Sequence, residues 1–516
     1  MDAKAKINQF YQLLCRNGRP GRLGKTFKTE SNYYFLDTGT GKVMQVEEIT
    51  FKVLQALIES ENVEGLFELG LTPEELDCSI SEIEKVIKEE HILSAYEVKT
   101  LIGDAVVNDL HETLTNSVEN VTLEVTEKCN LRCKYCVYNP SHPENRGFGY
   151  KDMTWDTAKK SIDFLKEHSK DAKHVHIGFY GGEPLLNFKL IKKVVLYALE
   201  LFNHNVGFGM TTNATLIDKE IACFLIKHHF DLIVSLDGPQ ELHDKNRITI
   251  NGEGSFDKTV QGSKMLLEAQ KNMKKEPEIS FNMVISGPNY EDDYTKIQEF
   301  IESEEWLPKN VMVLTSAVDS GPKESPYFLP QSKEERKLYG SIYEPLEEWE
   351  IAYKKEKGET CKTLFSDSVF DKNMMVIHKR LLSDTPVKNY GMNGCCVPGQ
   401  RRIYVTVDGD FRLCERVGLI PGIGNIDEGF NIEIIERLYT RDFIEEAQKY
   451  CKECWAINLC TLCYVNCYDE VKTHFAYRHN SCRSERSYLE NSLIRYHMIM
   501  EHDTESLSQY NERELT

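Results

Sequence analysis

Short apolar runs alternate with segments of helical periodicity through the middle of the chain. Six of these runs predict strands, at residues 121–126, 174–180, 206–211, 231–236, 279–285 and 310–314. The segments between them predict helices at 154–168, 188–202, 217–229, 256–270 and 290–303. Alternating β and α units of this kind build a parallel sheet with right-handed crossovers. Because there are six repeats rather than eight, we expect an α/β fold, a partial (β/α)6 TIM barrel over residues 115–320, with its chemistry at the carboxyl ends of the strands.

The N-terminal part of the chain has a different pattern. Residues 33–36 and 43–46 predict two short strands, and the turn-forming sequence between them predicts a hairpin. Helical spacing follows, with a helix start at Thr72–Glu75. We therefore expect an α+β domain over residues 1–105. Its outline resembles the winged-helix (PqqD-like) domain that recognises peptide leaders in many peptide-modifying enzymes; a purely structural extension is the alternative.

The remaining segments are less regular. Residues 321–390 predict a charged bridging region, and residues 391–516 form a cysteine-rich C-terminal domain. That last segment has too little apolar periodicity to fold on a core of its own, so a bound metal would have to supply the missing stability.

Charge and hydropathy narrow the classes of partner. The chain has 516 residues, with 62 Lys and Arg against 82 Asp and Glu, which gives a formal charge of −20. Such a surface repels nucleic acid and anionic lipid. No apolar run approaches the ~18 residues that span a bilayer, and the N-terminus lacks a secretory signal. We expect a soluble, cytoplasmic protein with no nucleic-acid or membrane partner.

Cysteine is the most informative residue type. Of sixteen cysteines, three lie between residues 129 and 136 and nine between residues 395 and 482. In a long acidic chain without a signal peptide, clustered cysteines bind metal more often than they form disulfides.

The first cysteine group directly follows the strand at 121–126. Cys129, Cys133 and Cys136 have the spacing CxxxCxxC. Three thiolates on one loop can hold three irons of a [4Fe–4S] cluster and leave the fourth iron open for catalysis. Zinc would need a fourth ligand, for which His142 is the only local candidate.

At these residues the chain resembles the radical SAM (S-adenosylmethionine) superfamily. Gly181-Gly182-Glu183-Pro184 matches that family's GGEP motif, and further matching segments, at 212–215, 235–238 and 243–247, follow the next two strands. The resemblance implies that SAM is bound by Tyr135, Gly181, Gly182, Glu183, Asn213, Ser235, Asp237 and Arg247. It also implies that an electron from a reductant such as flavodoxin or ferredoxin cleaves SAM, and that the 5′-deoxyadenosyl radical abstracts hydrogen from a substrate.

Within that resemblance the residues have different roles. The glycines let the backbone approach the methionine part of SAM, and Glu183 receives its amino group. Tyr135 packs near adenine, and the other four residues, Asn213, Ser235, Asp237 and Arg247, lie near the ribose and the carboxylate.

The second cysteine group resembles the SPASM domain, which holds two auxiliary [4Fe–4S] clusters and would bring the total to three. A double zinc ribbon is the alternative. The implied outer set of ligands is Cys451, Cys454, Cys460 and Cys482, and the inner set is Cys396, Cys414 and either Cys463 or Cys467. The spacing after Cys460 departs from the family pattern, and Cys395 is directly adjacent to Cys396. The fourth inner position is therefore either Cys395 or open.

The resemblance implies a peptide-modifying enzyme. Glu415, next to Cys414, is a candidate proton acceptor, or else a solvated charge or a partner of Arg412 or Arg416. With an N-terminal domain suited to a precursor-peptide leader, we expect a maturase of the sactipeptide or ranthipeptide type that forms Cys thioether crosslinks in a ribosomally made peptide. A carbon–carbon (cyclophane-type) crosslinking maturase and an anaerobic formylglycine-generating, sulfatase-maturing enzyme are the alternatives.

Overall fold

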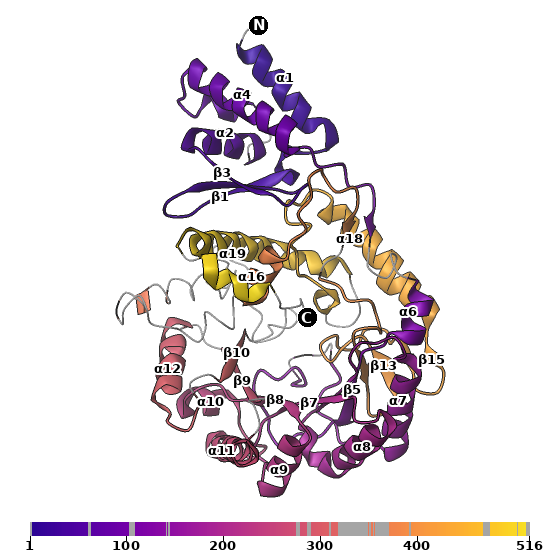
Figure 1. Cartoon of the computed structure of the whole chain (residues 1–516). Helices are drawn as coiled ribbons and strands as arrows, with labels where there is room; N and C mark the ends of the chain where they lie inside the picture. The colour runs from indigo at the N-terminus through magenta and orange to yellow at the C-terminus, as the bar shows by residue number, and fades with distance from the viewer. Residues whose placement is uncertain are drawn as a thin grey trace.

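A computed structural model of the chain describes most of its residues, and their arrangement is drawn in Figure 1. The described residues are 3–59, 63–102, 109–140, 142, 145–274, 279–285, 290–308, 311–317, 349, 352–353, 356, 371–391, 394–467, 475–502 and 504–511. Most of the predicted bridging region at 321–390 and residues 468–474 of the second cysteine group lie outside this set.

The main sheet contains the six predicted strands in sequential order, all parallel. They are β5 (Asn120–Thr126), β6 (His176–Gly181), β7 (Gly207–Thr212), β8 (Phe230–Ser235), β9 (Ile279–Ile285) and β10 (Met312–Ala317). The crossovers contain α7 (Trp155–His168), α8 (Phe188–Leu201), α9 (Lys219–Lys227), α10 (Gln240–Asn246), α11 (Phe256–Met273) and α12 (Tyr290–Ser303). The predicted α/β core with a parallel sheet is confirmed.

The buried faces of these strands explain why the sheet forms. Val121, Leu123 and Val125 of β5 are almost completely buried, as are Ile177 and Phe179 of β6. Strands that are apolar on both faces suit a parallel sheet covered by crossover helices. This packing holds the carboxyl ends of all six strands along one edge.

The sheet does not end at β5. The short strand β12 (Ile403–Val405) pairs with β5 in parallel register, and β13 (Asp410–Arg412), β14 (Gly424–Asn425) and β15 (Gly429–Phe430) continue the sheet in antiparallel pairs. Val405 and Phe411 are fully buried in the same core as β5. The predicted boundary at residue 391 therefore does not coincide with a break in the sheet or in the core.

The N-terminal residues form a three-stranded antiparallel sheet with helices on one side. Its strands are β1 (Gly24–Lys28), β2 (Tyr33–Asp37) and β3 (Val43–Val46), and its helices include α1 (Ala3–Leu14), α2 (Glu48–Glu59), α3 (Glu64–Phe67) and α4 (Pro73–Glu90). The helix start at Thr72 has the expected capping box with Glu75. The predicted hairpin is present, and β1 is an additional strand.

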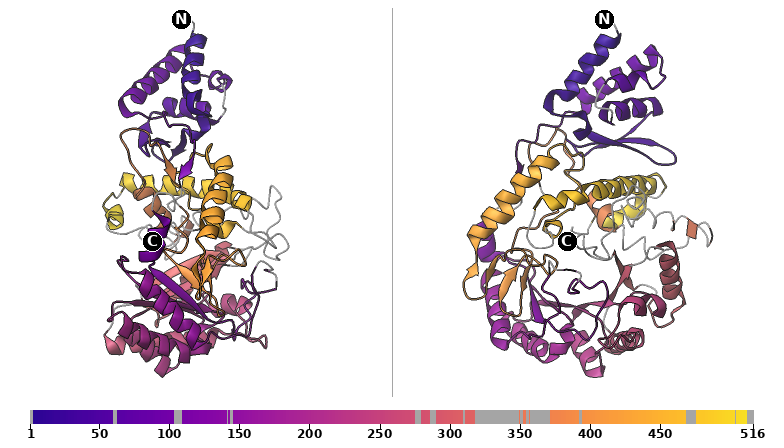
Figure 2. Two further views of the ribbon diagram at one scale, coloured as in Figure 1. Left: turned by 90° about the vertical axis from the view of Figure 1, so that its right-hand side faces the viewer. Right: turned by 180° about the vertical axis from the view of Figure 1, so that it is seen from behind.

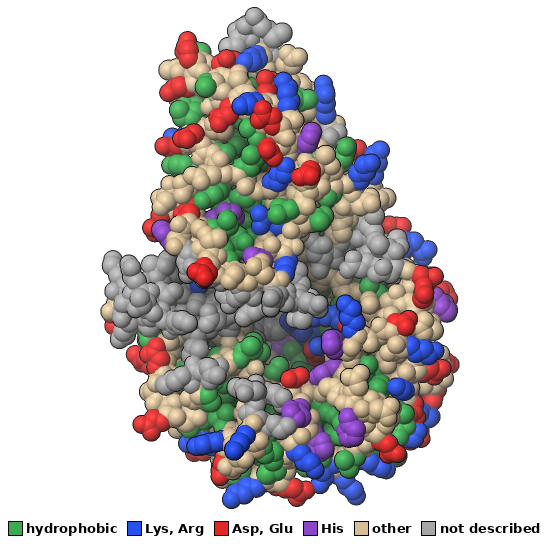
Figure 3. Space-filling view, viewed as in Figure 1, with side chains coloured by type: hydrophobic (Ala, Val, Ile, Leu, Met, Phe, Trp, Pro, Cys, Tyr) green, Lys and Arg blue, Asp and Glu red, His purple; other side chains and the backbone are tan. Residues whose placement is uncertain are grey.

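The C-terminal helices lie between the N-terminal domain and the main sheet. Figures 1 and 2 show α19 (Cys482–His502) and α16 (Asp371–His378) beneath the N-terminal sheet, with α18 (Phe443–Cys451) along one side. Short elements complete the fold: β4 (Leu101–Ile102), which pairs with β11 (Tyr390–Gly391), α6 (Leu110–Asn116), α17 (Ile432–Ile434) and a π-helical turn at Ile435–Asp442. In the space-filling view of Figure 3, acidic and basic side chains are interspersed over the visible face. Among the described helices, none has the length and apolar content that crossing a membrane requires.

Candidate functional site

A cavity of about 570 Å³ opens at the carboxyl ends of the parallel strands. Cys129, Cys133 and Cys136, from the loop after β5, line one part of it. Residues from the next five strands or their following loops line much of the rest, and Glu415 and Arg416 reach it from the C-terminal region. The edge at which the sheet pattern predicts chemistry is thus the edge that contains the cavity.

The cysteine loop is held by backbone hydrogen bonds to the segment after α10. The amide of Arg132 donates to the Ile248 carbonyl at 2.7 Å, and the amide of Lys134 donates to the Asn246 carbonyl at 3.0 Å. The side chain of Arg132 also donates to the carbonyl of Cys129 at 2.8 Å. These contacts fix the direction in which the three thiols face.

The glycines of the GGEP segment allow it to pack against the cysteine loop. A Cβ on Gly182 would lie 2.2 Å from the Lys128 carbonyl oxygen and 2.9 Å from Cβ of Cys129. Gly181 has φ of +142° and equally little space beside Thr126. Because a side chain would push the two loops apart, these positions require glycine.

Glu183 is buried at the base of the cavity. Its carboxylate accepts hydrogen bonds from the Thr212 hydroxyl at 2.7 Å and from the backbone amides of Asn213 and Leu185 at 2.8 and 3.1 Å. Burial nevertheless raises the pKa of this carboxyl above its ordinary value. A cationic group of a ligand, such as an ammonium, would stabilise the ionised form.

Asn213 connects its own loop with the cysteine loop. Its amide nitrogen donates to the side-chain oxygen of Asn130 at 3.0 Å, while its oxygen accepts from the hydroxyl of Thr215 at 2.6 Å. Ser235, at the end of β8, also lines the cavity.

Tyr135 and Arg247 line the cavity, and Asp237 lies behind them. The Tyr135 hydroxyl donates to the Asp237 carboxylate, and Nε of Arg247 lies 2.9 Å from the same carboxylate oxygen. Although burial lowers it, the nearby Asp237 and Tyr135 raise the pKa of Arg247 above its ordinary value. Asp237 therefore orients two cavity residues, whereas the resemblance implies that it lies beside SAM itself.

The donor set of the first cysteine group fits an iron–sulfur cluster. Burial and the neighbouring Glu183 raise the pKa of the Cys129 thiol to about 12, and burial raises that of Cys133 to about 12. Such thiols stay protonated at neutral pH unless a bound cation replaces the proton. Across the part of the chain that the structure describes, no three His, Cys, Asp or Glu side chains surround a single-ion site. A cluster differs from a single ion because each thiolate binds a different iron.

The second group places the predicted outer cysteines around Arg478. The guanidinium of Arg478 donates to Sγ of Cys451 at 3.5 Å and to Sγ of Cys460 at 3.7 Å. Burial and the proximity of Cys451 raise the pKa of Cys482 to about 11. Cys454 is also close to Cys451. The structure thus gathers these four cysteines from three elements: the end of α18, the loop after it and the start of α19 (outer set).

The inner cysteines converge from three other segments. Burial, the adjacent Glu415 and the neighbouring Cys463 and Cys396 raise the pKa of Cys414 to about 12. Cys396, Cys414 and Cys463 (inner set) are therefore neighbours. Cys467 is fully buried with its Sγ 3.6 Å from the Cys463 carbonyl oxygen.

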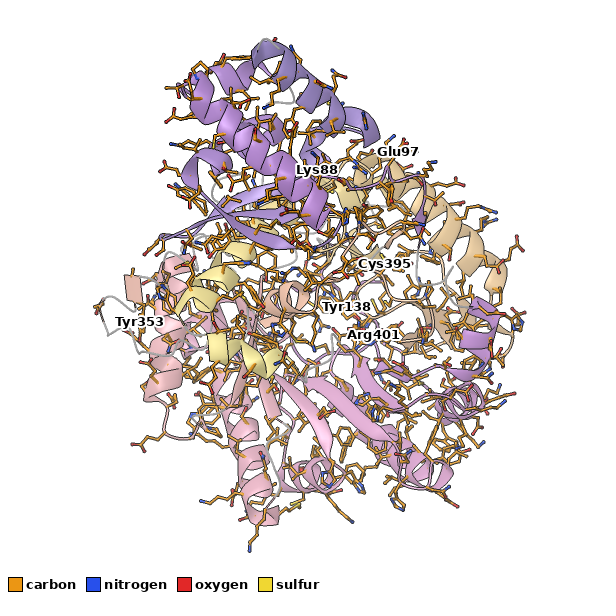
Figure 4. The ribbon with its side chains drawn as sticks, turned by 45° about the horizontal axis from the view of Figure 1, so that its top comes forward. Lys88, Glu97, Tyr138, Tyr353, Cys395 and Arg401 are labelled. Carbon is orange, nitrogen blue, oxygen red and sulfur yellow. The ribbon has the colours of Figure 1, made fainter. Side chains whose placement is uncertain are left out.

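Cys395 is also buried, with its Sγ 3.9 Å from the carbonyl oxygen of Leu462. In Figure 4, Cys395 lies in the central part of the molecule, in the same region as Tyr138 and Arg401. Cys395 and Cys467 thus both lie near Cys463, and each has its sulfur beside a backbone carbonyl.

Glu415 is paired with a residue that the sequence analysis does not single out. Nη1 of Arg402 donates to both carboxylate oxygens of Glu415, at 2.8 and 2.9 Å. Arg412 instead donates to the carbonyls of Gly418 and Ile420. The proposed pairing of Glu415 with Arg412 is therefore wrong, because Arg412 turns toward its own loop.

Sequence reasoning also does not identify Tyr180, Tyr138 and Asn282 as cavity residues. Tyr180 is the next-to-last residue of β6, directly before Gly181, and its ring lies 6.1 Å from that of Tyr404 in β12. The position at the end of a barrel strand is the signal that could have identified it.

Comparison with known proteins agrees with this geometry. Residues 123–301 match the family model of the Radical SAM superfamily. This part of the chain is thus similar to the radical SAM proteins. The match begins inside β5 and ends inside α12, so it includes the cysteine loop, the GGEP segment and the Asp237–Arg247 pair.

Two curated proteins illustrate the range of relatives of this chain. An uncharacterised protein of Methanocaldococcus jannaschii is 37% identical over 154 residues, which span 30% of this chain and only half of that protein. A cysteine-type anaerobic sulfatase-maturating enzyme of Clostridium novyi is 25% identical over 382 residues, 71% of this chain and 93% of the relative. The chain is thus related to sulfatase maturases well beyond the radical SAM domain.

A solved structure has the same fold. Native anSMEcpe with bound AdoMet and Cp18Cys peptide superimposes with a TM-score of 0.53 and 19% identity, over 75% of this chain and 99% of that one. At this identity the likeness concerns the fold.

Proposed function

We propose that the chain is a radical SAM maturase that forms Cys thioether crosslinks in a ribosomally made precursor peptide. The observation on which this rests is the cavity bordered on one side by Cys129, Cys133 and Cys136 and on the other by Glu415. A [4Fe–4S] cluster on the three thiols would supply one electron for the reductive cleavage of SAM.

The residues around the cavity would bind and orient SAM. The buried Glu183 carboxylate would receive its amino group, and Arg247, a cation held in place by Asp237, suits its carboxylate. The ring of Tyr135 offers an apolar face for adenine, and Asn213 and Ser235 offer hydrogen bonds for the ribose. The enclosed walls would exclude water from a reactive radical.

A peptide substrate is supported by the fold and by the lining of the cavity. The solved structure with this fold, anSMEcpe, is described with a bound Cp18Cys peptide. Glu415 and Arg416 line the same cavity as the cysteine loop and offer charged groups to a peptide that enters it.

The inner set supports sulfur chemistry. Cys396, Cys414 and Cys463 would hold three irons of an auxiliary cluster, and the outer set would hold a second auxiliary cluster. Cys395 and Cys467 each have their sulfur beside a backbone carbonyl. If neither binds iron, the fourth inner position would be available to a substrate thiolate.

The N-terminal domain would bind the leader of the precursor. Strand β3 pairs with β2 on one side only, so its other edge could accept an added strand from a peptide. A strand added there would place the leader on the N-terminal domain while the core segment extends toward the cavity.

The test is mass spectrometry of short peptides from neighbouring reading frames, after anaerobic incubation with the reconstituted full chain, SAM and dithionite. We expect 5′-deoxyadenosine and a peptide that has lost two hydrogens and retains its sulfur. Replacing the peptide's cysteines with serine should abolish the change. A loss of two hydrogens that persists in the serine peptide would overturn thioether formation in favour of a carbon–carbon crosslink.

Formylglycine formation is the second candidate, and the length of the match to a cysteine-type sulfatase-maturating enzyme favours it. In that reaction Glu415 would accept a proton from the substrate, and its two hydrogen bonds from Arg402 would hold the carboxylate in place. Replacement of the peptide's sulfur by a carbonyl oxygen, in a peptide taken from a sulfatase, would select this candidate over the first.

A further inference from the structure

Two consecutive residues between the last cysteines contact the sulfur atoms of the outer set. Arg478 is only 2% exposed, and its Nη1 and Nη2 point to Sγ of Cys451 and Cys460, at 3.5 and 3.7 Å. The same guanidinium donates to the carbonyl of Leu462 through Nε and Nη2, at 3.3 and 3.1 Å. These contacts with the carbonyl hold the planar guanidinium in one orientation, so each of the two sulfurs faces an N–H donor in a fixed position.

His479 contacts a third sulfur of the outer set. Its Nδ1 lies 3.5 Å from Sγ of Cys482, and its ring stacks on the half-exposed ring of Tyr450 with centroids 3.8 Å apart. Its Nε2 is buried and has no hydrogen-bond partner among the described residues. Because a thiolate only accepts hydrogen bonds, Nδ1 would carry the proton when Cys482 binds iron.

The fourth sulfur also has a cationic neighbour. Arg486 lies beside Cys454, where it opposes the rise that burial causes in the pKa of that thiol. The inner set has a different environment, since Cys414 lies beside Glu415, whose charge is paired with that of Arg402. The outer set instead has N–H donors aimed directly at three of its sulfurs.

We propose that Arg478 and His479 are positioning residues that raise the reduction potential of the outer cluster above that of the inner cluster. This inference rests on the proposed function, in which both auxiliary clusters are present. Reduction adds one electron to a cluster and its four thiolates, and no bond forms or breaks. N–H donors and a nearby cation stabilise the added negative charge, so they favour the reduced form.

The stacked pair of rings defines a route for that electron. Tyr450 reaches the surface, and His479 lies between it and Cys482. The outer cluster would thus exchange electrons with an external protein through this corner of the molecule, and the inner cluster would pass electrons to the outer one because the outer one has the higher potential.

The test is a redox titration of the anaerobically reconstituted full chain with dithionite and mediators, followed by EPR. In Arg478→Gln, we expect the midpoint potential of one auxiliary cluster to fall by an amount equal to at least a tenfold change in the oxidised-to-reduced ratio, about 59 mV for one electron. The SAM-binding cluster should keep its potential, and the inner cluster should shift less than the outer one, because Arg478 is also close to Cys395 and Cys467 but donates to neither sulfur. Arg478→Lys retains the positive charge but lacks the planar guanidinium with its several N–H donors. The midpoint potential should therefore fall less in Arg478→Lys than in Arg478→Gln.

A matched control is Arg380→Gln, which removes a guanidinium that donates to the carbonyls of Gly41 and Ile377 instead of to sulfur. It should leave all potentials unchanged. If Arg478→Gln does not assemble its clusters, two variants of His479 provide the test.

His479→Phe keeps the ring stacked on Tyr450 but removes the N–H donor to Cys482, so it should lower the midpoint potential of the outer cluster. His479→Asn keeps a donor but loses the stacked ring, so the midpoint potential should stay close to that of the wild type.

The outcomes separate this inference from the proposed function. A wild-type chain that binds only about four irons would contradict the auxiliary clusters themselves. A wild-type chain with about twelve irons, combined with unchanged potentials in Arg478→Gln and His479→Phe, would overturn the role of these two residues and leave the proposed function in place.

Discussion

Glu183 is the buried carboxylate around which the candidate SAM pocket is arranged. Three donors, from Thr212, Asn213 and Leu185, hold it in place, yet burial still raises its pKa. A carboxylate in this situation gains more from a bound cation than an exposed one does, because little water competes for it. Glu183 is thus suited to bind the amino group of SAM.

The first prediction concerns that charge. Glu183→Gln should raise the dissociation constant for SAM about 10- to 100-fold, since a hydrogen bond to a charged group contributes roughly 1.5–3 kcal/mol. Equilibrium dialysis with the reconstituted chain measures it. The control is Glu127→Gln, whose carboxylate accepts from the Lys151 amide and does not line the cavity. Unchanged affinity in Glu183→Gln would mean that SAM does not contact this residue.

At the scale of residues, local motifs predict which residues belong to the site better than they predict which other residues these contact. Gly182 and Glu183 lie where the motif and its strand imply, beside the cysteine loop. The contact of Glu415 with Arg402 and the position of Asp237 behind Tyr135 depend on how distant segments pack. No short pattern in the sequence specifies such contacts, because they are set by the final positions of whole strands.

At the scale of elements, the N-terminal sheet contacts the segments that hold the outer set. At one end, the side chains of Thr29, Asn32 and Tyr34 all donate to Oε1 of Glu501 in α19, at 2.8, 2.9 and 2.6 Å. At the other end, the hydroxyl of Thr38 donates to the Trp455 carbonyl at 2.9 Å. Helix α19 begins with Cys482, and Trp455 follows Cys454, so one sheet braces two ligand segments.

The second prediction tests this contact through its pH dependence. Burial raises the pKa of Glu501, but the hydrogen bonds from Tyr34, Asn32 and Thr29 outweigh it, so the pKa lies below its ordinary value of 4.5. A lowered pKa means that the stabilisation is complete above that value and is lost as the pH falls through the folded-state pKa. Glu501→Gln should therefore destabilise the sheet near neutral pH by about 0.5–1 kcal/mol, because solvent screening weakens hydrogen bonds to this partly exposed carboxylate.

Thermal melting curves and hydrogen exchange of β1 and β2 measure the effect. The difference between wild type and Glu501→Gln should shrink as the pH is lowered below 4.5. The exposed Glu505, which follows the same helix, provides the matched variant Glu505→Gln. Equal melting curves for all three proteins at neutral pH would rule out a stabilising role for Glu501.

The sequence predicts helices and strands correctly where the apolar pattern lies within the element itself. The six parallel strands and β2–β3 follow from their own apolar patterns. Strand β1 is short and begins with a glycine, so its pattern is weak, and it forms because β2 supplies its partner. Strand β12 pairs with β5 although Ile403 and its partner Val121 are 282 positions apart in the sequence. Such pairing depends on the completed sheet.

At the scale of the whole molecule, one chain gathers three groups of thiols between two sheets. The first lies at the edge of the parallel sheet, and the other two lie in the segments that connect it with the N-terminal domain. Burial raises the pKa of at least one thiol in each group to 11 or 12. Because a raised pKa favours the protonated thiol, each set would hold thiolates only when a bound metal replaces the protons.

The iron and sulfide content of the anaerobically reconstituted full chain tests this account most directly. We predict about twelve irons per chain in the wild type, from three [4Fe–4S] clusters, and about eight in a variant with Cys129, Cys133 and Cys136 replaced by Ala. That variant should also produce no 5′-deoxyadenosine from SAM. A wild-type chain with about four irons, or a triple variant that still cleaves SAM, would contradict the account.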